Sequence, residues 1–412
     1  MLGPGLLYAG AAVGVSHLVQ STKAGAGFGF ELVWVLIIAN ILKYPFFEFG
    51  PRYAISTGSS LVEGYYKVGK WAIVLFSLLT IATMFAIQAA VTIVTAGLVA
   101  NIFGIGIDIT FLCAVILLVT TFVLIIGKYN ALDLIIKVII TLLAVSTIVA
   151  VAFALEIDVI KKPEAMTGFI WSNKLHIAFL IAFVGWMPAP IDVSVWHSLW
   201  SIAKRKQLRQ MPSLGMALAD FKIGYIGTAF LALGFLSLGA LVMHGTGGQL
   251  SPSGSIFAGQ LIEMYTLPLG KWAYWVIAIA ALTTMFSTTL TCLDAYPRVL
   301  KRTTEMLVPV LRERRRENLW LTWFWLIILV IGTIVLLGAL SNTMGFMVDL
   351  ATTISFITAP FFAIMNYKVV TDRHMPSFGR PKTWLKIYAQ IGIVFLCIFT
   401  LAYIIFEIGN II

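Results

Sequence analysis

The chain has 412 residues, of which 60% are hydrophobic and only 11% are charged, and its formal net charge is +10. Soluble domains carry charge on about a quarter of their residues, so this composition excludes a soluble fold. About eleven apolar segments, each long enough to cross a bilayer, leave only short loops between them. We therefore predict an all-α integral membrane protein with a single transmembrane domain, residues 1–412.

The expected spans, in chain order, are 2–26, 30–50, 72–100, 108–127, 131–156, 175–202, 219–243, 271–297, 318–340, 343–367 and 384–408. Basic residues gather in alternate loops between them, which the positive-inside rule explains without any nucleic-acid partner. The same rule places these loops and the N-terminus in the cytoplasm. We expect a monomer in the lipid bilayer of the bacterial inner membrane.

The first span contains small residues where an uninterrupted apolar helix would be expected. It begins with Gly3-Pro4-Gly5, and residues 10–17 read Gly-Ala-Ala-Val-Gly-Val-Ser-His. The sixth span is interrupted by residues 185–192, Gly-Trp-Met-Pro-Ala-Pro-Ile-Asp, in which two prolines remove backbone donors. Both spans are therefore expected to be broken helices.

The two breaks fall at equivalent places if residues 1–156 and 175–367 are compared as halves, with 384–408 as an additional helix. Paired interrupted segments of this kind are typical of transporters built from inverted repeats. Backbone groups left open in a membrane are tolerated only where they line a cavity or bind a ligand. The breaks thus predict a binding site for a small solute, and the dipoles of the half-helices alone do not choose its charge.

His17 and Asp192 are the ionisable residues nearest the two breaks, and ionisable groups inside a membrane usually serve function. Two structural alternatives stay open: His17 as a neutral imidazole bonded to a carbonyl, and Asp192 as the N-cap of the following half-helix. Met187 could offer its thioether to a metal or simply pack. The predicted substrate-binding residues are Gly14, Ser16, His17, Met187, Ala189 and Asp192, with His17, Met187 and Asp192 as metal ligands.

The first 64 residues resemble the start of the Nramp family of divalent-metal transporters, through Gly3-Pro-Gly5, Ala24-Gly-Ala-Gly-Phe-Gly29, Leu32-Val-Trp-Val35 and Ser56-Thr-Gly58. The resemblance continues more weakly to Phe286-Ser-Thr-Thr-Leu-Thr291. It implies a LeuT-like fold of the APC superfamily and secondary transport by alternating access. The implied substrate is manganese, iron, zinc or magnesium, with no cofactor besides the transported metal.

Three positions depart from the family pattern. Residues 14–17, Gly-Val-Ser-His, replace the family's Asp-Pro-Gly-Asn, and its Met-Pro-His falls on residues 190–192, although a Met-Pro pair stands at 187–188. Its acidic positions for proton movement fall on Gln88 and Val91, which cannot exchange protons. Compared with the family pattern, the carboxylate thus lies in the sixth span and the imidazole in the first. Because the acidic positions are replaced, transport without proton coupling is an open alternative.

Three further polar residues are candidates for an ion pathway or gate, together with Gln88. Asp294 follows a run of serines and threonines, Asp349 lies one turn before Thr352, and Thr352 aligns with a gating or binding position of the family. Intramembrane acids of this kind are expected to mark ion pathways. A Glu48–Arg52 pair, by contrast, has the i,i+4 spacing of a structural ion pair.

Three other functions compete with metal transport. The same fold could hold a non-metal solute, with Trp186 and Trp196 shaping the pocket, or act as a receptor that transports nothing. An intramembrane hydrolase using His17 and Asp192 is disfavoured because no nucleophile accompanies them. We therefore predict that the protein is not an enzyme.

Overall fold

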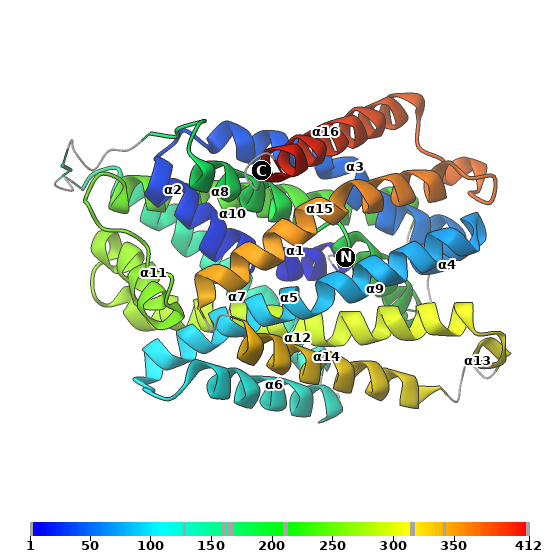
Figure 1. The fold of residues 1–412 in the computed structure, drawn as a ribbon, viewed down its shortest axis with the longest axis horizontal. Helices are drawn as coiled ribbons and strands as arrows, with labels where there is room; N and C mark the ends of the chain where they lie inside the picture. Colours follow the sequence, from blue (N-terminus) through cyan, green and yellow to red (C-terminus); the bar gives the residue numbers. More distant parts are fainter. Residues whose placement is uncertain are drawn as a thin grey trace.

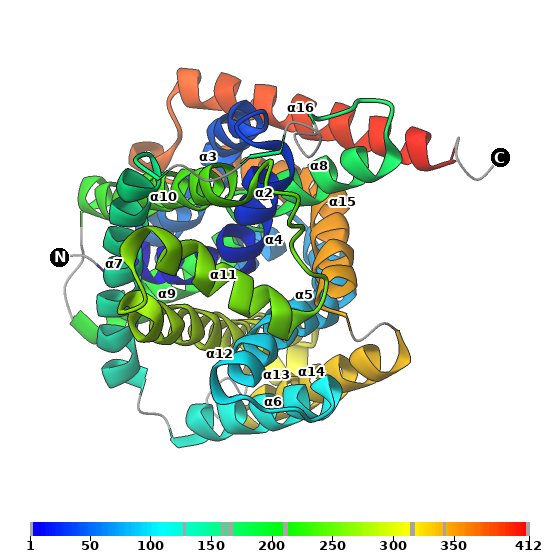
Figure 2. The same ribbon diagram turned by 90° about the vertical axis from the view of Figure 1, so that its left-hand side faces the viewer.

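The computed structural model describes residues 3–126, 129–157, 161–162, 168–208, 213–313, 318–340 and 343–408. Throughout these ranges the regular structure is helical, as expected where no water can satisfy an open backbone. Most of the long helices run roughly along the long axis of the molecule (Figure 1). Viewed from one end, they pack side by side as a bundle (Figure 2).

The helices and their bounds are α1 Pro4–Ala12, η1 Ser16–Ser21, α2 Thr22–Phe28, α3 Val33–Thr57, α4 Leu61–Val68, α5 Lys70–Phe103, α6 Ile109–Ile126, α7 Tyr129–Ala154, α8 Lys174–Trp186, α9 Val193–Leu208, α10 Leu214–Leu238, η3 Gly239–Met243, α11 Gly254–Leu269, α12 Ala273–Leu307, α13 Pro309–Glu313, α14 Leu319–Ala339, α15 Met344–Thr371, η4 Ser377–Gly379 and α16 Thr383–Ile408.

Both predicted broken helices are present. The first is made of α1, the π-helical η1 and α2, and the second of α8 and α9, with residues 187–192 between them. In the described part of the chain, eight unbroken helices are long and apolar enough to cross a membrane. The all-helical prediction is therefore confirmed, while the count of eleven spans and the division into repeats 1–156 and 175–367 stay predictions.

Three helices were not predicted. The short α4 begins with a capping box in which Ser60 and Glu63 bond each other's backbone groups, a signal that is visible in the sequence. α11 lies between the predicted spans 219–243 and 271–297, where a loop was expected. α13 is a single short turn after α12. α12 itself is 35 residues long and continues ten residues past its predicted end at 297.

Several outer helices expose their apolar side chains instead of burying them. Leu118 in α6, Val335 in α14 and Ile398 in α16 are each about three-fifths exposed, and these helices lie at the rim of the bundle in Figure 2. A face of this kind would be unstable in water but suits hydrocarbon. The protein is an integral membrane protein.

The pieces of the first broken helix lie inside the bundle. α1 lies near the middle of Figure 1, and Tyr8, Val13 and Leu18 are fully buried. α1 packs against α10 so closely that a Cβ on Gly5 would lie 2.1 Å from the carbonyl oxygen of Asp220. The close approach therefore requires glycine at this position.

Candidate solute-binding site

The first break lies between Ala12 and Ser16, where the helix opens and then resumes in a wider π-helical turn. The amide of Gly14 donates to the carbonyl of Ala12 over 2.9 Å. A Cβ on Gly14 would lie 2.9 Å from Cγ2 of Thr288 in α12, so the opened backbone touches that helix. Glycine is needed here for close approach, as the sequence pattern indicated.

His17 is fully buried, and both of its ring nitrogens have protein partners. Nε2 donates to the carbonyl oxygen of Thr228 in α10 over 3.0 Å, and Nδ1 lies 2.7 Å from the hydroxyl of Ser16. The Ser16 hydroxyl also contacts the carbonyl oxygen of Ala12 over 2.7 Å, so both ring nitrogens face protein atoms and neither faces an open site. The geometry agrees with the structural alternative, and the metal-ligand role of His17 stays a prediction.

The second break ends at Asp192, whose carboxylate is buried with a relative exposure of 3%. The hydroxyl of Tyr296 in α12 donates to its Oδ2 over 3.3 Å. Oδ1 has no hydrogen-bond partner among the described residues. The carbonyl of Asp192 accepts the amide of Val195 in the first turn of α9 over 2.8 Å, so the carboxylate lies at the positive end of a half-helix.

The two tryptophans near the second break have different surroundings. Trp196 packs edge-to-face on Tyr296, the residue that contacts Asp192, with ring centroids 5.0 Å apart. Trp186 instead donates its indole N–H to the hydroxyl of Ser355 in α15 over 2.7 Å. The first therefore belongs to the surroundings of the carboxylate, and the second ties α8 to α15.

Met187 and Ala189 lie within the break and are both buried. Met187 belongs to an apolar cluster that includes Leu36 of α3 and Val184 of α8, whereas Ala189 belongs to the main core. A thioether surrounded by aliphatic groups is typical of packing. A metal-binding role for Met187 stays a prediction.

Lys43 is a polar residue at this break that the sequence analysis did not single out. Its side chain is fully buried in α3. The ammonium donates to the carbonyl oxygens of Val184, over 2.5 Å, and Gly185, over 2.9 Å, in the last turn of α8. A lysine in the middle of an apolar span was the available signal, but the sequence could not identify its partner.

Gln88 lies in an uncharged network between α5 and α12. Its amide nitrogen lies 3.1 Å from the hydroxyl of Thr92 and 3.4 Å from the carbonyl oxygen of Thr289. The hydroxyls of Thr95 and Thr289 are 2.8 Å apart in the same interface. These groups bond one another without an acid that could release a proton.

The side chains of the other predicted pathway residues have separate partners. Asp294 forms an ion pair with Arg298, with 2.6 Å between its Oδ1 and Nε of the arginine. Asp349 is exposed and interacts electrostatically with Lys23. The Thr352 hydroxyl donates within its own helix, to the carbonyls of Val348 and Asp349. The structure does not gather these residues into one cluster, and their pathway role stays a prediction.

A larger metal cluster is not found at the breaks. Among the described residues, no group of three or more histidine, cysteine, aspartate or glutamate side chains could hold a metal ion. The hydrogen bonds of His17 lead to α10 and that of Asp192 leads to α12. His17 and Asp192 therefore contact different helices in this structure, and their predicted joint role as metal ligands stays a prediction.

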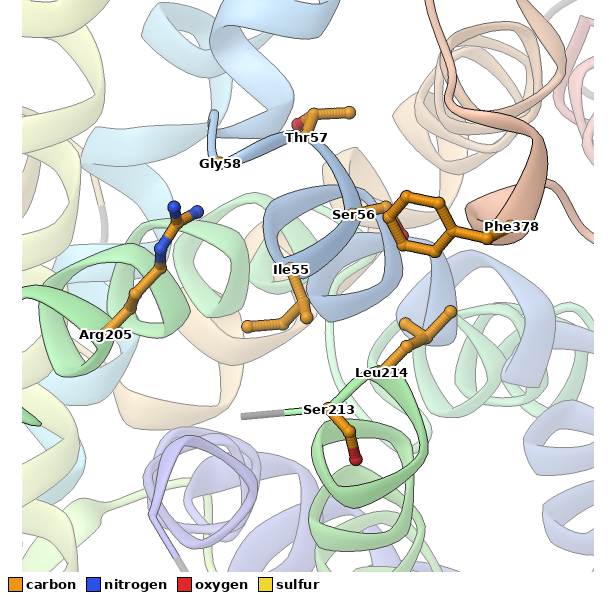
Figure 3. Close-up of a pocket in the computed structure, with 8 residues that line it drawn as sticks. All are labelled: Ile55, Ser56, Thr57, Gly58, Arg205, Ser213, Leu214 and Phe378. Carbon is orange, nitrogen blue, oxygen red and sulfur yellow. The ribbon is translucent and has the colours of Figure 1, made fainter. Parts of the chain in front are cut away.

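A cavity of about 400 Å³ lies elsewhere, at the end of α3. Figure 3 shows its lining: Ile55, Ser56, Thr57, Gly58, Arg205, Ser213, Leu214 and Phe378. None of these residues belongs to either break. At the breaks themselves Gly14, Ala189 and Asp192 are buried, so the candidate site is closed over in this structure.

Comparison of the sequence with known families and proteins gives a consistent result. The model of the natural resistance-associated macrophage protein-like family, Nramp, matches residues 5–406. An uncharacterized protein of Pasteurella multocida (strain Pm70) is 36% identical over 406 residues, which cover 98% of this chain and 91% of that protein.

Solved structures share the fold at low sequence identity. A mutant of the Eremococcus coleocola manganese transporter has a TM-score of 0.69 at 14% identity, covering 97% of this chain and 85% of that one. MhsT in complex with L-phenylalanine scores 0.62 at 16% identity, covering 97% and 98%. A nucleobase-cation-symport-1 family transporter with bromovinylhydantoin bound scores 0.59 at 14% identity, covering 98% and 92%. The predicted LeuT-like fold is confirmed.

Proposed function

Because the chain belongs to the Nramp family, we propose that it is a secondary transporter that moves a divalent metal cation across the membrane by alternating access. Family membership supports transport rather than enzymatic activity. The observation that carries the proposal is Asp192, a buried carboxylate at a helix break with one oxygen that no described residue bonds. A buried charge without a full set of partners is costly, and a bound cation would offset that cost.

The donors at the breaks favour a metal that accepts oxygen ligands. His17 uses both nitrogens within the protein, and Met187 lies in an apolar cluster. What is left is the Asp192 carboxylate, backbone carbonyls and water, a set that suits manganese or magnesium better than zinc. The likeness to a manganese transporter of Eremococcus coleocola supports manganese as the first cation to test, with iron next.

The proposal includes transport without a coupled proton. Gln88 stands where the family resemblance places an acidic residue, and its described partners are threonine groups. A side-chain amide cannot take up and release a proton near neutral pH. A cytoplasmic N-terminus, supported by the basic residues in alternate loops, a bacterial inner-membrane location and a monomeric state complete the proposal.

Uptake of Mn²⁺ into proteoliposomes, read by an internal metal-sensitive dye, tests the function. Asp192→Asn keeps the volume and the bond from Tyr296 but removes the charge, and we expect at least about a tenfold loss of Mn²⁺ uptake and affinity. Asp108→Asn is the matched control, because exposed Asp108 only caps α6 and asparagine caps equally well. Equal Mn²⁺ affinity in both variants would refute Asp192 as the ligand.

A second candidate is a small organic cation. Trp196 and Tyr296 place two aromatic rings beside the single carboxylate, and aromatic faces attract organic ammonium groups. A thermal-shift screen of the purified protein separates the two candidates. Stabilisation by Mn²⁺ supports metal transport, whereas stabilisation by amines alone supports the organic solute.

A further inference from the structure

The carbonyl end of α8 is occupied by a positive charge from another helix. Lys43 of α3 is fully buried, and its ammonium donates to the carbonyl oxygens of Val184 and Gly185, over 2.5 and 2.9 Å. These two carbonyls lie directly before the break. The contact therefore joins α3 to the end of a half-helix rather than to an acidic side chain.

The end of a half-helix inside a membrane needs such a partner. The last carbonyls of a helix have no amide to bond within it, and they carry the negative end of the helix dipole. The segment after α8 contains Pro188 and Pro190, which have no N–H to donate. The carbonyl of Val184 accepts the amide of Met187 over a long 3.4 Å, so, without water, the remaining bonding capacity of these carbonyls falls to a side chain or an ion.

No carboxylate shares the charge of Lys43 among the described residues. The described ion pairs do not include it. Glu48, five residues further along α3, is bonded instead by Arg52, over 2.5 Å, and by the hydroxyl of Tyr44. The ammonium is thus held by carbonyl oxygens, which are the groups that bind a bare monovalent cation in a membrane protein.

The carbonyl end itself is held in place from its other side. A Cβ on Gly185 would lie 2.4 Å from the carbonyl oxygen of Thr352, and the Trp186 indole donates to Ser355, so α15 packs tightly on the last turn of α8. Lys43 therefore meets a preorganised pair of oxygens between α3 and α15.

We propose that the Lys43 ammonium is the permanent occupant of a monovalent-cation site at the carbonyl end of α8, so that the protein needs no free monovalent cation there. A tethered ammonium supplies the charge and up to three donors that a bound ion would otherwise supply. The occupied site does not depend on which solute is carried. The transport arm of the test below rests on the proposed function, but the stability arm does not.

Thermal unfolding of the purified protein tests the site directly. Lys43→Ala leaves the carbonyls without a cation and opens space for one, and we expect the melting temperature to fall by about 3–6 °C. Ethylammonium chloride should restore most of the loss, whereas ethanol at the same concentration should not. Lys222→Ala, at an exposed lysine of α10, is the control and should neither lose stability nor respond to ethylammonium.

Lys43→Gln keeps a hydrogen-bond donor but removes the charge, and it tests the idea if the alanine variant does not fold. We expect its Mn²⁺ uptake to become dependent on added Na⁺, K⁺ or ethylammonium, while uptake by the unaltered protein stays independent of them. A glutamine variant with full stability and cation-independent uptake would overturn the proposal. So would a destabilised alanine variant that no cation restores. If neither protein takes up any metal, the proposed function fails, and the stability arm still decides the site.

Discussion

Asp192 differs in its partners from the other buried acids near the site. Glu48 is paired with Arg52, and Glu305 with Arg302, whereas the side-chain group that bonds Asp192, at the start of a half-helix, is the uncharged hydroxyl of Tyr296. Paired acids of this kind stabilise a bundle but offer little to an ion. Of these three buried acids, Asp192 is therefore the one without a cationic side-chain partner among the described residues.

His17 makes the complementary case, and its role can be separated from that of Asp192 by one substitution. His17→Gln can still donate to Thr228, so we expect Mn²⁺ affinity within about threefold of the unaltered protein. His17→Ala removes the bond to the carbonyl of Thr228 and the contact with Ser16, and we expect it to lower the free energy of unfolding by about 1–3 kcal/mol. Isothermal titration with Mn²⁺ and chemical denaturation measure the two effects.

The opposite result is equally clear. If His17→Gln abolishes Mn²⁺ binding while the free energy of unfolding stays the same, the imidazole is a metal ligand and must leave Thr228 to bind the ion.

The sequence predicted a polar residue at this break but not the orientation of its side chain. Thr228 lies 211 residues away along the chain, and no local pattern identifies such a partner.

Among the elements, the broken helices were the most predictable and the added short helices the least. Prolines 188 and 190 and the glycines of residues 3–14 act on the backbone locally, so their effect can be read from the sequence. α11 begins at Gly254 in a Gly/Ser-rich stretch and contains Pro268, features that locally favour a loop. Its packing against α5 and α12 overrides that preference.

The first turn of the N-terminal half-helix α1 is tied to α10 by a carboxylate. Oδ1 of Asp220 in α10 accepts the amide of Gly3 over 3.0 Å, and Oδ2 accepts that of Gly5 over 2.7 Å. A carboxylate at the first turn bonds open amides and matches the helix dipole. The nine residues of α1 thus depend on α10 for the position of their first turn.

We expect Asp220→Ala to raise hydrogen–deuterium exchange over residues 3–12 by about tenfold, because the loss of two charge-assisted bonds weakens the local closure by about 1–3 kcal/mol. Mass spectrometry of peptides from the exchanged protein measures the deuterium uptake of residues 3–12. Asp108→Ala, which removes the equivalent cap from α6, is the control and should leave residues 3–12 unchanged. Unaltered exchange in Asp220→Ala would show that α1 is held by packing alone.

At the scale of the whole molecule, polar contacts tie several helices together at the end where α4 lies. Arg302 of α12 bonds Glu63 of α4. Tyr65 of α4 donates to Asn366 of α15, which donates in turn to Ser194 of α9 over 2.8 Å. These contacts link α4, α9, α12 and α15, so movement of the second broken helix would require several of them to break together. Together with the buried break residues, these contacts keep the candidate site closed in this structure.

The described hydrogen-bond partners of Gln88 include no acidic side chain, so the proposed function predicts that the membrane potential alone drives transport. A divalent ion that moves without a counter-ion carries two charges across the membrane potential, worth about 4.6 kcal/mol per 100 mV. Accumulation of Mn²⁺ should therefore rise about tenfold for every 30 mV of inside-negative potential, set in proteoliposomes with K⁺ and valinomycin. A pH gradient at zero potential should drive none, and an internal pH dye should stay constant during uptake. Mn²⁺ accumulation that follows the pH gradient instead would mean that a proton pathway exists away from Gln88.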